Sequence, residues 1–152
     1  MVVTTGKRFE SRFFKSLKRL PGMAIRVHDN GGKPTDDVLL GDFMLYRPDG
    51  EVFAIECKST SKTRLPFVSA GKSGDGLRDE QLAKLVEFDR TAKNLHSLVA
   101  IHYQWTDELV LVNMDAITAY RKGSGYKSIS EEDAAQIGWR QAKEGREWRL
   151  RI

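Results

Sequence analysis

The chain has 152 residues, of which 40% are hydrophobic and 30% are charged, and this composition excludes intrinsic disorder and predicts a single domain over residues 1–152. A lone cysteine, Cys57, excludes an internal disulfide or a cysteine-rich zinc site, and no run reaches the roughly 18 apolar residues of a membrane helix. The formal net charge is +4 and the N-terminal segment lacks the apolar stretch of a secretory signal, so we expect a cytoplasmic protein without a membrane partner.

The first predicted element is an amphipathic helix that starts after residue 4 or 5. Its apolar side chains recur at helical spacing from Phe9 to Leu20, opposite a basic face. A Pro–Gly pair at residues 21–22 ends it. Residues 23–28 are then typical of a strand, and residues 29–34 are rich in turn-forming residues.

Two further strands are predicted at residues 38–46 and 51–58, joined by the sequence Arg-Pro-Asp-Gly at 47–50. Pro, Asp and Gly in this order favour a type I turn followed by a left-handed glycine, which is a common hairpin connection with a bulge. We therefore expect Gly50 to be the left-handed residue of a β-hairpin.

The remaining elements follow in a mixed order of helices and strands. We expect a loop at 59–76, a helix at 77–92, strands at 96–103 and 108–113, a short helix at 115–122, a helix capped by Ser130 that runs to about residue 143, and a last strand at 148–152. This order predicts an α/β or α+β fold in which a mixed β-sheet is flanked by helices.

The hairpin turn also sets the pairing of two acidic residues. If Arg47 pairs with Glu51, counting outward along the strands pairs Asp42 with Glu56. Directly opposite side chains point to the same face with Cβ atoms about 4.5–5.5 Å apart, and two like charges at that separation destabilise the pair. Lys58 shares this face because alternate strand residues point the same way.

A divalent cation would turn this repulsion into attraction. Mg²⁺ is bound by oxygen atoms, and the two carboxylates with the backbone carbonyl of Cys57 would leave positions for water and phosphate. Lys58 would then orient the nucleophile or stabilise charge. The pattern therefore indicates phosphodiester hydrolysis with the metal as Lewis acid.

Each candidate residue also has a structural alternative. Asp42 could form an ion pair with Lys58 or an arginine, and Glu10 could be an exposed acid favoured by the dipole of its helix. Gln81 could be a buried amide bonded to the backbone.

Basic residues on both sides of the acidic segment indicate a polyanionic partner. Residues 1–35 carry eight Lys and Arg against two acids, and residues 58–78 carry five against one. A solvated helix face explains some of this charge equally well. The candidate phosphate contacts for DNA are Lys7, Arg8, Arg12, Lys15, Arg26, Lys62, Arg64 and Lys72.

The order of these motifs resembles the PD-(D/E)xK nuclease superfamily, and in detail the Holliday junction resolvases of the RecU type and, more loosely, the archaeal Hjc type. The resemblance covers residues 6–113. It rests on the helix segment Gly-Lys-Arg-Phe-Glu at 6–10, on Asp42, on Glu-Cys-Lys-Ser-Thr at 56–60 with the Leu-Pro-Phe that follows at 65–67, and on Gln81. The chain departs from the family pattern at Glu80, where a histidine is usual, and in the short span 29–37, where RecU-type proteins project a stalk.

The resemblance implies a structure-selective endonuclease with a restriction-endonuclease-like mixed sheet. Such an enzyme uses Mg²⁺, with Mn²⁺ as an alternative, cuts branched double-stranded DNA at four-way junctions to leave 5′-phosphate ends, and acts as a homodimer. The implied catalytic residues are Glu10, Asp42, Glu56, Lys58 and Gln81, and the implied metal ligands are Asp42, Glu56, Cys57 and Glu10. Two alternatives stay open: a nuclease of the same superfamily that acts on flapped, nicked or damaged DNA, and a non-catalytic DNA-binding protein.

Overall fold

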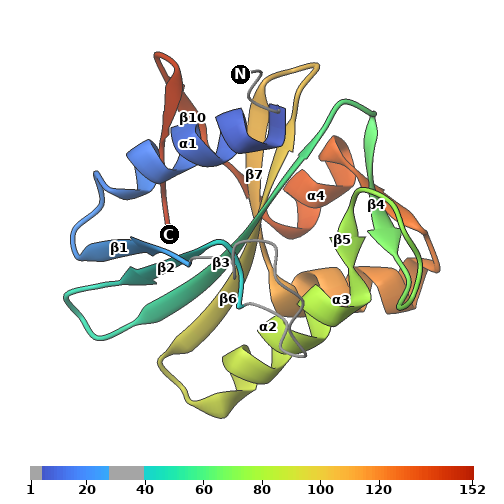
Figure 1. Cartoon of the computed structure of the whole chain (residues 1–152), viewed down its shortest axis with the longest axis horizontal. Coiled ribbons are helices and arrows are strands. Elements are labelled where there is room, and N and C mark those ends of the chain that lie inside the picture. The colour runs from blue at the N-terminus through green and yellow to red at the C-terminus, as the bar shows by residue number, and fades with distance from the viewer. Residues whose placement is uncertain (1–4, 28–39) are drawn as a thin grey trace.

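The computed structural model describes residues 5–27 and 40–152, and Figure 1 shows how the elements are arranged. The helices are α1 (Thr5–Leu17), α2 (Asp79–Thr91), α3 (Met114–Ser124) and α4 (Glu131–Ile137). The strands are β1 (Met23–Arg26), β2 (Phe43–Tyr46), β3 (Val52–Thr60), β4 (Arg64–Val68), β5 (Leu77–Arg78), β6 (Leu95–Tyr103), β7 (Glu108–Asn113), β8 (Ser128–Ser130), β9 (Trp139–Arg140), β10 (Ala142–Glu144) and β11 (Glu147–Arg149).

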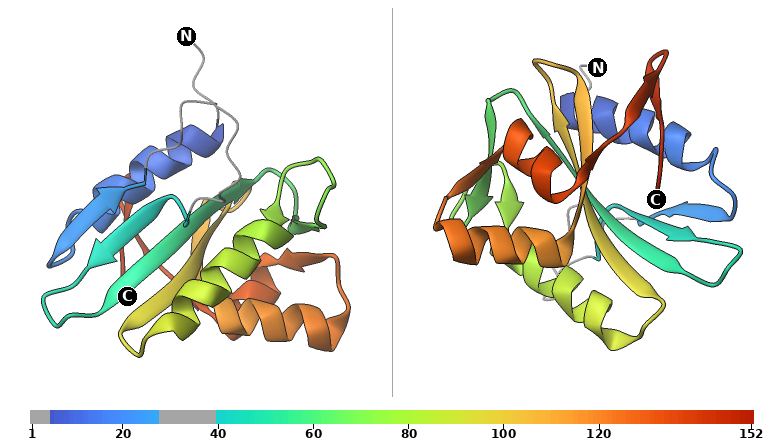
Figure 2. Two further views of the ribbon diagram at one scale, coloured as in Figure 1. Left: turned by 60° about the horizontal axis from the view of Figure 1, so that its bottom comes forward. Right: turned by 180° about the vertical axis from the view of Figure 1, so that it is seen from behind.

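A six-stranded sheet in the order β1-β2-β3-β6-β7-β9 forms the centre of the fold. The pair β3–β6 is parallel and the other neighbouring pairs are antiparallel, so the predicted mixed sheet is confirmed. Figure 2 shows α1 on one side of this sheet and α2 with α3 on the other. Both faces of β3 therefore lie against helices, which is typical of central strands in α/β folds.

Apolar side chains of α1 pack on the first face of the sheet, as the spacing predicts. Phe9, Phe13 and Leu17 are at most 1% exposed and share a core with Phe43 and Ile55. The helix ends at Leu17, and a strand follows the Pro–Gly pair. The predicted N-terminal helix is confirmed.

The predicted hairpin between β2 and β3 is confirmed with its register. Arg47 N–H donates to Glu51 O over 2.9 Å, and Gly50 N–H donates to Arg47 O over 3.0 Å. Gly50 has φ of 90°, the left-handed conformation expected of a bulge glycine. The ladder continues to the pair Phe43–Ile55.

The predicted loop at 59–76 is wrong, because it contains β4, which pairs with β8 and β5. Pro66 inside this strand hides it from a propensity argument, since proline cannot donate to a ladder. The next helix begins at Asp79 rather than at residue 77, because residues 77 and 78 pair with β4.

The helix after Ser130 is confirmed at its start and wrong at its end. Ser130 Oγ accepts from Asp133 N–H over 3.1 Å, as an N-cap does. The helix stops at Ile137 because Gly138 approaches Leu111 O so closely that a Cβ there would lie 2.2 Å from it. Strand β9 then joins β7, which ends any helical run to residue 143.

Other predictions fall partly beyond the described ranges. The span 29–37 and the ends of the strands predicted at 23–28 and 38–46 lie outside the described residues. The last strand is β11 rather than residues 148–152, and it forms a hairpin with β10. Among the described residues, no helix is both long and apolar enough to cross a membrane.

Candidate active site

The chain bends at Asp42 immediately before β2. Gly41 has φ of 70°, and a Cβ on it would lie 2.8 Å from Ile55 O, so the bend requires glycine. Asp42 N–H donates to Ile55 O over 2.8 Å, and Asp42 Oδ2 accepts from Cys57 N–H over 2.8 Å. The side chain of Asp42 is therefore fixed against the backbone of β3.

The register at Asp42 differs from the predicted one. Asp42 N–H donates to the carbonyl oxygen of Ile55, and Ile55 is already the ladder partner of Phe43. Asp42 therefore does not pair with Glu56 in the ladder. Its charge nevertheless acts on Glu56, whose pKa it raises. The two carboxylates thus belong to one electrostatic cluster, as predicted, although the backbone hydrogen bonds at Asp42 differ from those of the predicted ladder.

Glu56 lies in the middle of β3 and is only 4% exposed. Its Oε1 atom is 3.3 Å from Lys58 Nζ and accepts from Gln81 Nε2 over 2.9 Å. A buried carboxylate is costly without such partners. The structure therefore brings together Glu56, Lys58 and Gln81, as the resemblance implies.

The first turn of α2 holds Gln81 in place. Gln81 Oε1 accepts from Arg78 N–H over 3.1 Å, while its Nε2 donates to Glu56. These opposite partners fix which end of the amide faces the carboxylate. The structural alternative for Gln81, an amide bonded to backbone, is thus combined with the contact to the site.

Three carboxyl groups in the cluster hold their protons more tightly than usual. Burial first, and then the charge of Asp42, raises the pKa of Glu56 to about 7. Burial also raises the pKa of Asp42, against the opposing hydrogen bond from Cys57 and the charges of Lys58 and Arg26. Burial and then Asp42 raise the pKa of Glu10 on α1. Without a cation, the charges of Asp42 and Glu10 therefore disfavour ionisation of the Glu56 carboxyl.

The donor set suits a hard divalent cation. Carboxylate oxygens of Asp42 and Glu56 are the ligands that Mg²⁺ prefers, and a cation between them would offset the negative charge of Asp42 that, after burial, raises the pKa of Glu56. Among the described residues, no group of three or more metal-binding side chains is gathered at one point. Burial raises the pKa of the Cys57 thiol well above its ordinary value, so only the backbone carbonyl of this residue is a candidate ligand.

Six of the eight predicted phosphate contacts are exposed. Arg26 lies over the rings of Phe14 and Phe43, with its guanidinium carbon 5.5 and 5.4 Å from their centroids, and its charge acts on Asp42 and Glu10. Of the eight predicted contacts, Arg26 is therefore the one whose charge acts on both of these carboxylates. The exposed residues are Lys7, Arg8, Lys15, Arg26, Lys62 and Lys72.

The other two predicted contacts, Arg12 and Arg64, are engaged within the protein. Arg12 donates to both carboxylate oxygens of Asp107 over 3.1 and 3.2 Å. Arg64 donates to Ser128 Oγ over 2.7 Å and to Ser128 O over 2.8 Å. A phosphate would have to displace these bonds, so both residues are weaker candidates than the exposed lysines.

Sequence reasoning missed a polar chain next to the site. Ser59 Oγ is 3.0 Å from His102 Nδ1, and His102 Nε2 is 2.7 Å from Asp107 Oδ1. Burial first, and then the positive charges of Arg12 and Lys143, lowers the pKa of His102 to about 4. No local sequence pattern brings Ser59 and His102 together, because they become neighbours only through the parallel register of β3 and β6.

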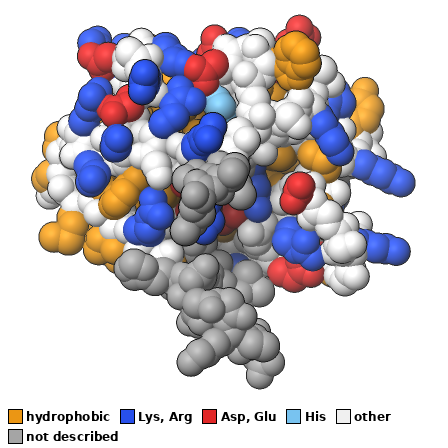
Figure 3. Space-filling view, turned by 45° about the horizontal axis from the view of Figure 1, so that its top comes forward, with side chains coloured by type: hydrophobic (Ala, Val, Ile, Leu, Met, Phe, Trp, Pro, Cys, Tyr) orange, Lys and Arg blue, Asp and Glu red, His pale blue; other side chains and the backbone are white. Residues whose placement is uncertain are grey.

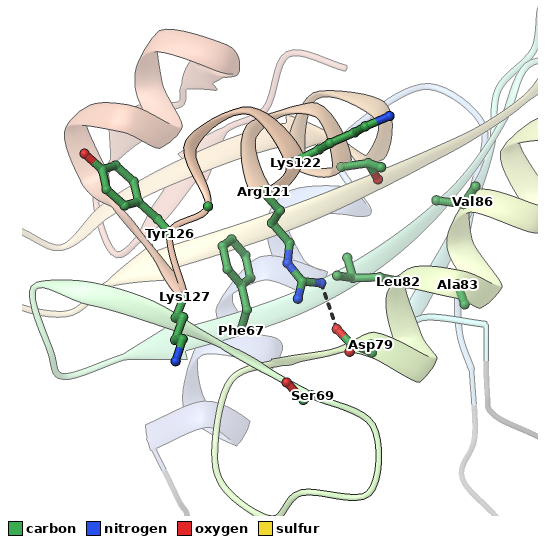
Figure 4. Close-up of a pocket in the computed structure, with 12 residues that line it drawn as sticks. Phe67, Ser69, Asp79, Leu82, Ala83, Val86, Arg121, Lys122, Tyr126 and Lys127 are labelled. Atoms are coloured by element: carbon green, nitrogen blue, oxygen red, sulfur yellow. Dashed lines mark hydrogen bonds and ion pairs between the residues drawn. The ribbon is translucent and has the colours of Figure 1, made fainter.

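A separate pocket of about 790 Å³ lies between α2, α3 and β4 (Figure 4). Phe67, Leu82 and Val86 contribute apolar surface, and Arg121 bonds to Asp79 over 2.8 Å while lying on the Phe67 ring. None of the predicted site residues lines it. We place the candidate active site at the carboxylates, since metal-dependent hydrolysis requires their charged groups and this pocket contains none of them.

Substituting Gln81 tests the contact with Glu56. Gln81→Leu is expected to lower about tenfold the cleavage of the branched DNA that the resemblance implies as substrate, because it removes one hydrogen bond to the carboxylate of Glu56. Gln81→Glu should lower it further by placing another negative charge against Glu56. Cleavage rates at saturating protein give the result, and Gln136→Leu on α4, which is exposed, is the matched control. Equal rates for the Gln81 variants and the control would refute a role for Gln81.

Three comparisons relate the chain to known proteins. Among curated proteins, no sequence matches. A solved structure of Hjc, a Holliday junction resolvase from Archaeoglobus fulgidus, is similar with a TM-score of 0.59 and 21% sequence identity, over 88% of this chain and 93% of that one. At this identity the likeness shows the fold. The family model described as archaeal Holliday junction resolvase (Hjc) matches residues 1–143, so that this chain belongs to the Hjc family.

Proposed function

We propose that this protein is a Holliday junction resolvase, a metal-dependent endonuclease that hydrolyses phosphodiester bonds in four-way DNA junctions and leaves 5′-phosphate ends. Membership of the Hjc family supports the substrate class. The cluster of Asp42, Glu56, Lys58 and Gln81 supports the reaction type. The single domain of residues 1–152 would carry the whole site.

One observation carries this proposal: the buried carboxylate of Glu56 and the half-buried carboxylate of Asp42, whose charge disfavours ionisation of Glu56, are held beside a lysine. Asp42 is clamped by Cys57 N–H, and Glu56 is held by Lys58 and Gln81. A fold that needed only stability would not retain this repulsion, because neutral residues of similar size remove it. A function that requires negative charge at this position explains why the two carboxylates are present.

Asp42, Glu56 and the carbonyl of Cys57 would hold Mg²⁺ or Mn²⁺. When bound, such an ion acts as a Lewis acid on the phosphate and lowers the pKa of a coordinated water. The described hydrogen bonds of the two carboxylates use Asp42 Oδ2 and Glu56 Oε1, which leaves Oδ1 and Oε2 as the candidate ligand atoms.

The remaining site residues have distinct proposed roles. Lys58, whose side chain is 20% exposed, orients the attacking water and stabilises the charge that develops on the phosphate. Gln81 holds the Glu56 carboxylate in one orientation. Glu10 extends the negative field from α1, consistent with its electrostatic effect on Glu56, and would act on the metal directly or through water.

We further propose that the protein acts as a homodimer in the cytoplasm. A four-way junction has two-fold symmetry, and symmetric incision of two strands requires two active sites related by the same symmetry. The exposed cations near the site, Arg26 and Lys62 among them, would contact phosphates of the arm being cut, and this affinity should fall steeply with salt.

A cleavage assay tests the proposal. The protein is incubated with an end-labelled four-way junction and with linear duplex of the same sequence, in Mg²⁺, in Mn²⁺ and in a chelator. We expect paired, symmetric incisions in the junction alone, only with metal, and products that ligase can rejoin because they carry 5′-phosphates.

The other outcomes separate the alternatives. Metal-dependent cleavage of flapped or nicked duplex but not of the junction would replace a resolvase with another nuclease of the superfamily. Junction binding without any cleavage would indicate a DNA-binding protein. A single unpaired incision by a monomer would contradict the proposed homodimer.

A further inference from the structure

We propose that α1 and the hairpin β10–β11 form a second DNA surface, which binds the phosphates of a junction arm away from the cleavage site. This inference rests on the proposed function for its substrate. The family model ends its match at residue 143, inside β10, so the turn of the hairpin and all of β11 lie beyond the matched region. Membership of the family therefore says least about the role of this hairpin.

The hairpin is fixed firmly against α1. Trp148 is 1% exposed, and its backbone N–H donates to Ser16 Oγ of α1 over 3.0 Å. The guanidinium of Arg12 lies 4.3 Å from the centre of the Trp148 ring and donates from Nε to Arg146 O over 2.7 Å. The turn of the hairpin therefore lies beside the middle of α1 in one defined position.

Asp107 ties three elements together under this surface. Its carboxylate contacts Arg12 of α1, His102 of β6 and Lys143 of β10. Asp107 has φ of 54°, a conformation unfavourable for a residue other than glycine, and its contacts compensate for it. The charges of Arg12 and Lys143 are thus used to build the surface rather than to bind a ligand.

Other cations on the same surface remain available. Arg8 and Lys15 flank Arg12 at intervals of four and three residues, which places all three on one side of α1, and Glu10 lies two residues away on the opposite side. Arg8, Lys15 and Arg146 are exposed, and among residues 5–27 and 40–152 no hydrogen bond or ion pair engages their charged groups. They form a basic ridge, which is the name used below for these three residues.

The charge of the whole surface is strongly positive. Figure 3 views the molecule with the top of Figure 1 brought forward and shows Lys and Arg side chains gathered there with a few acids between them. Around the basic ridge, seven Lys and Arg face three carboxylates; they are Arg8, Arg12, Lys15, Arg19, Lys143, Arg146 and Arg149 against Asp107, Glu144 and Glu147.

A duplex arm is the ligand that this geometry fits best. The ridge is rigid and basic, and it is separated from Glu10 by the width of α1, about 10 Å. The arms of a four-way junction leave its centre in several directions, so an arm that is not being cut can lie along such a surface. Phosphate contacts of this kind add affinity without sequence preference. Removing one of them makes the binding affinity less dependent on salt concentration.

Charge reversal on the ridge tests the inference with two junctions, one with arms of about three helical turns and one with arms of about one turn. We expect Arg146→Glu and Lys15→Glu each to weaken binding of the long-arm junction about five- to tenfold and to lower the slope of log affinity against log salt by about 1. The short-arm junction should be bound almost as by the native protein, and the pattern of incisions at saturating protein should not change.

The matched control is Lys93→Glu, which makes the same change in net charge at an exposed site between α2 and β6, at the opposite end of Figure 1 from the hairpin. If both ridge variants bind long-arm junctions like this control, the inference is overturned and the ridge either serves an acidic protein or has no ligand. Failure of the native protein to cut any junction would contradict the proposed function instead, while the dependence of binding on arm length would still report on the ridge.

Discussion

Asp42→Asn is expected to lower the rate of junction cleavage about 10³-fold while junction binding is kept, because a metal ligand worth several kcal/mol of transition-state stabilisation is lost. The amide oxygen of asparagine can still accept the hydrogen bond from Cys57 N–H, so the bend before β2 is preserved. Loss of one negative charge beside the phosphates should not weaken binding. Single-turnover cleavage and a gel-shift titration measure the two quantities.

Asp49→Asn is the matched control for this experiment. Asp49 lies in the turn of the same hairpin, its side chain is 48% exposed, and it contacts Arg47 and Glu51 N–H rather than the site. Its variant should cleave like the native protein. Full activity in Asp42→Asn would remove the metal-ligand assignment, and loss of junction binding by a folded Asp42→Asn would mean that Asp42 serves binding rather than catalysis.

Glu56→Gln is expected to abolish cleavage and yet to stabilise the metal-free protein. The folded-state pKa of Glu56 is raised from 4.5 to about 7, so the folded state binds more protons than the unfolded state between these pH values. The stability of the native protein in chelator should therefore be complete below about pH 4.5 and fall as the pH rises to about 7. Glutamine has no charge to bury, so the variant should not show this loss.

The expected gain at pH 8 is about 3 kcal/mol in the free energy of unfolding, or about 6–12 °C in Tm for a domain of this size. Thermal and denaturant unfolding in chelator at pH 4.5 and pH 8 measure it, with the exposed Glu132→Gln as control. Added Mg²⁺ should stabilise the native protein and leave Glu56→Gln unchanged. The same dependence of stability on pH in the variant and the native protein would show that Glu56 is not the group whose buried charge destabilises the protein at high pH.

The sequence was most informative where structure depends on neighbours in the chain. The turn at residues 47–50 carries its own geometry, so the register from Arg47–Glu51 to Phe43–Ile55 followed from it. The prediction for Asp42 failed in detail because the bend also depends on Gly41 and on Val27 N–H, which bonds to Asp42 O over 2.8 Å. No local sequence pattern predicts that contact.

Other parts of the site depend on pairings distant in sequence. Periodicity suggested that one face of β3 is apolar and the other polar, but α1 lies on one face of the sheet and α2 on the other (Figure 2), and Glu56, which contacts Gln81 of α2, is 4% exposed. Gln81 was found only through the family resemblance, since its contact with Glu56 joins α2 to β3 across 25 positions. Arg12 and Arg64 looked like free cations because their partners lie on distant elements.

The central claim is that a cation between Asp42 and Glu56 makes their proximity functional. The most direct test is an anomalous difference map from crystals of the native protein soaked in Mn²⁺. We predict a peak within coordination distance of both carboxylates, about 2–2.5 Å from an oxygen of each, and its loss in Asp42→Asn. A map with Mn²⁺ bound elsewhere and no peak between these two residues would contradict the proposed site.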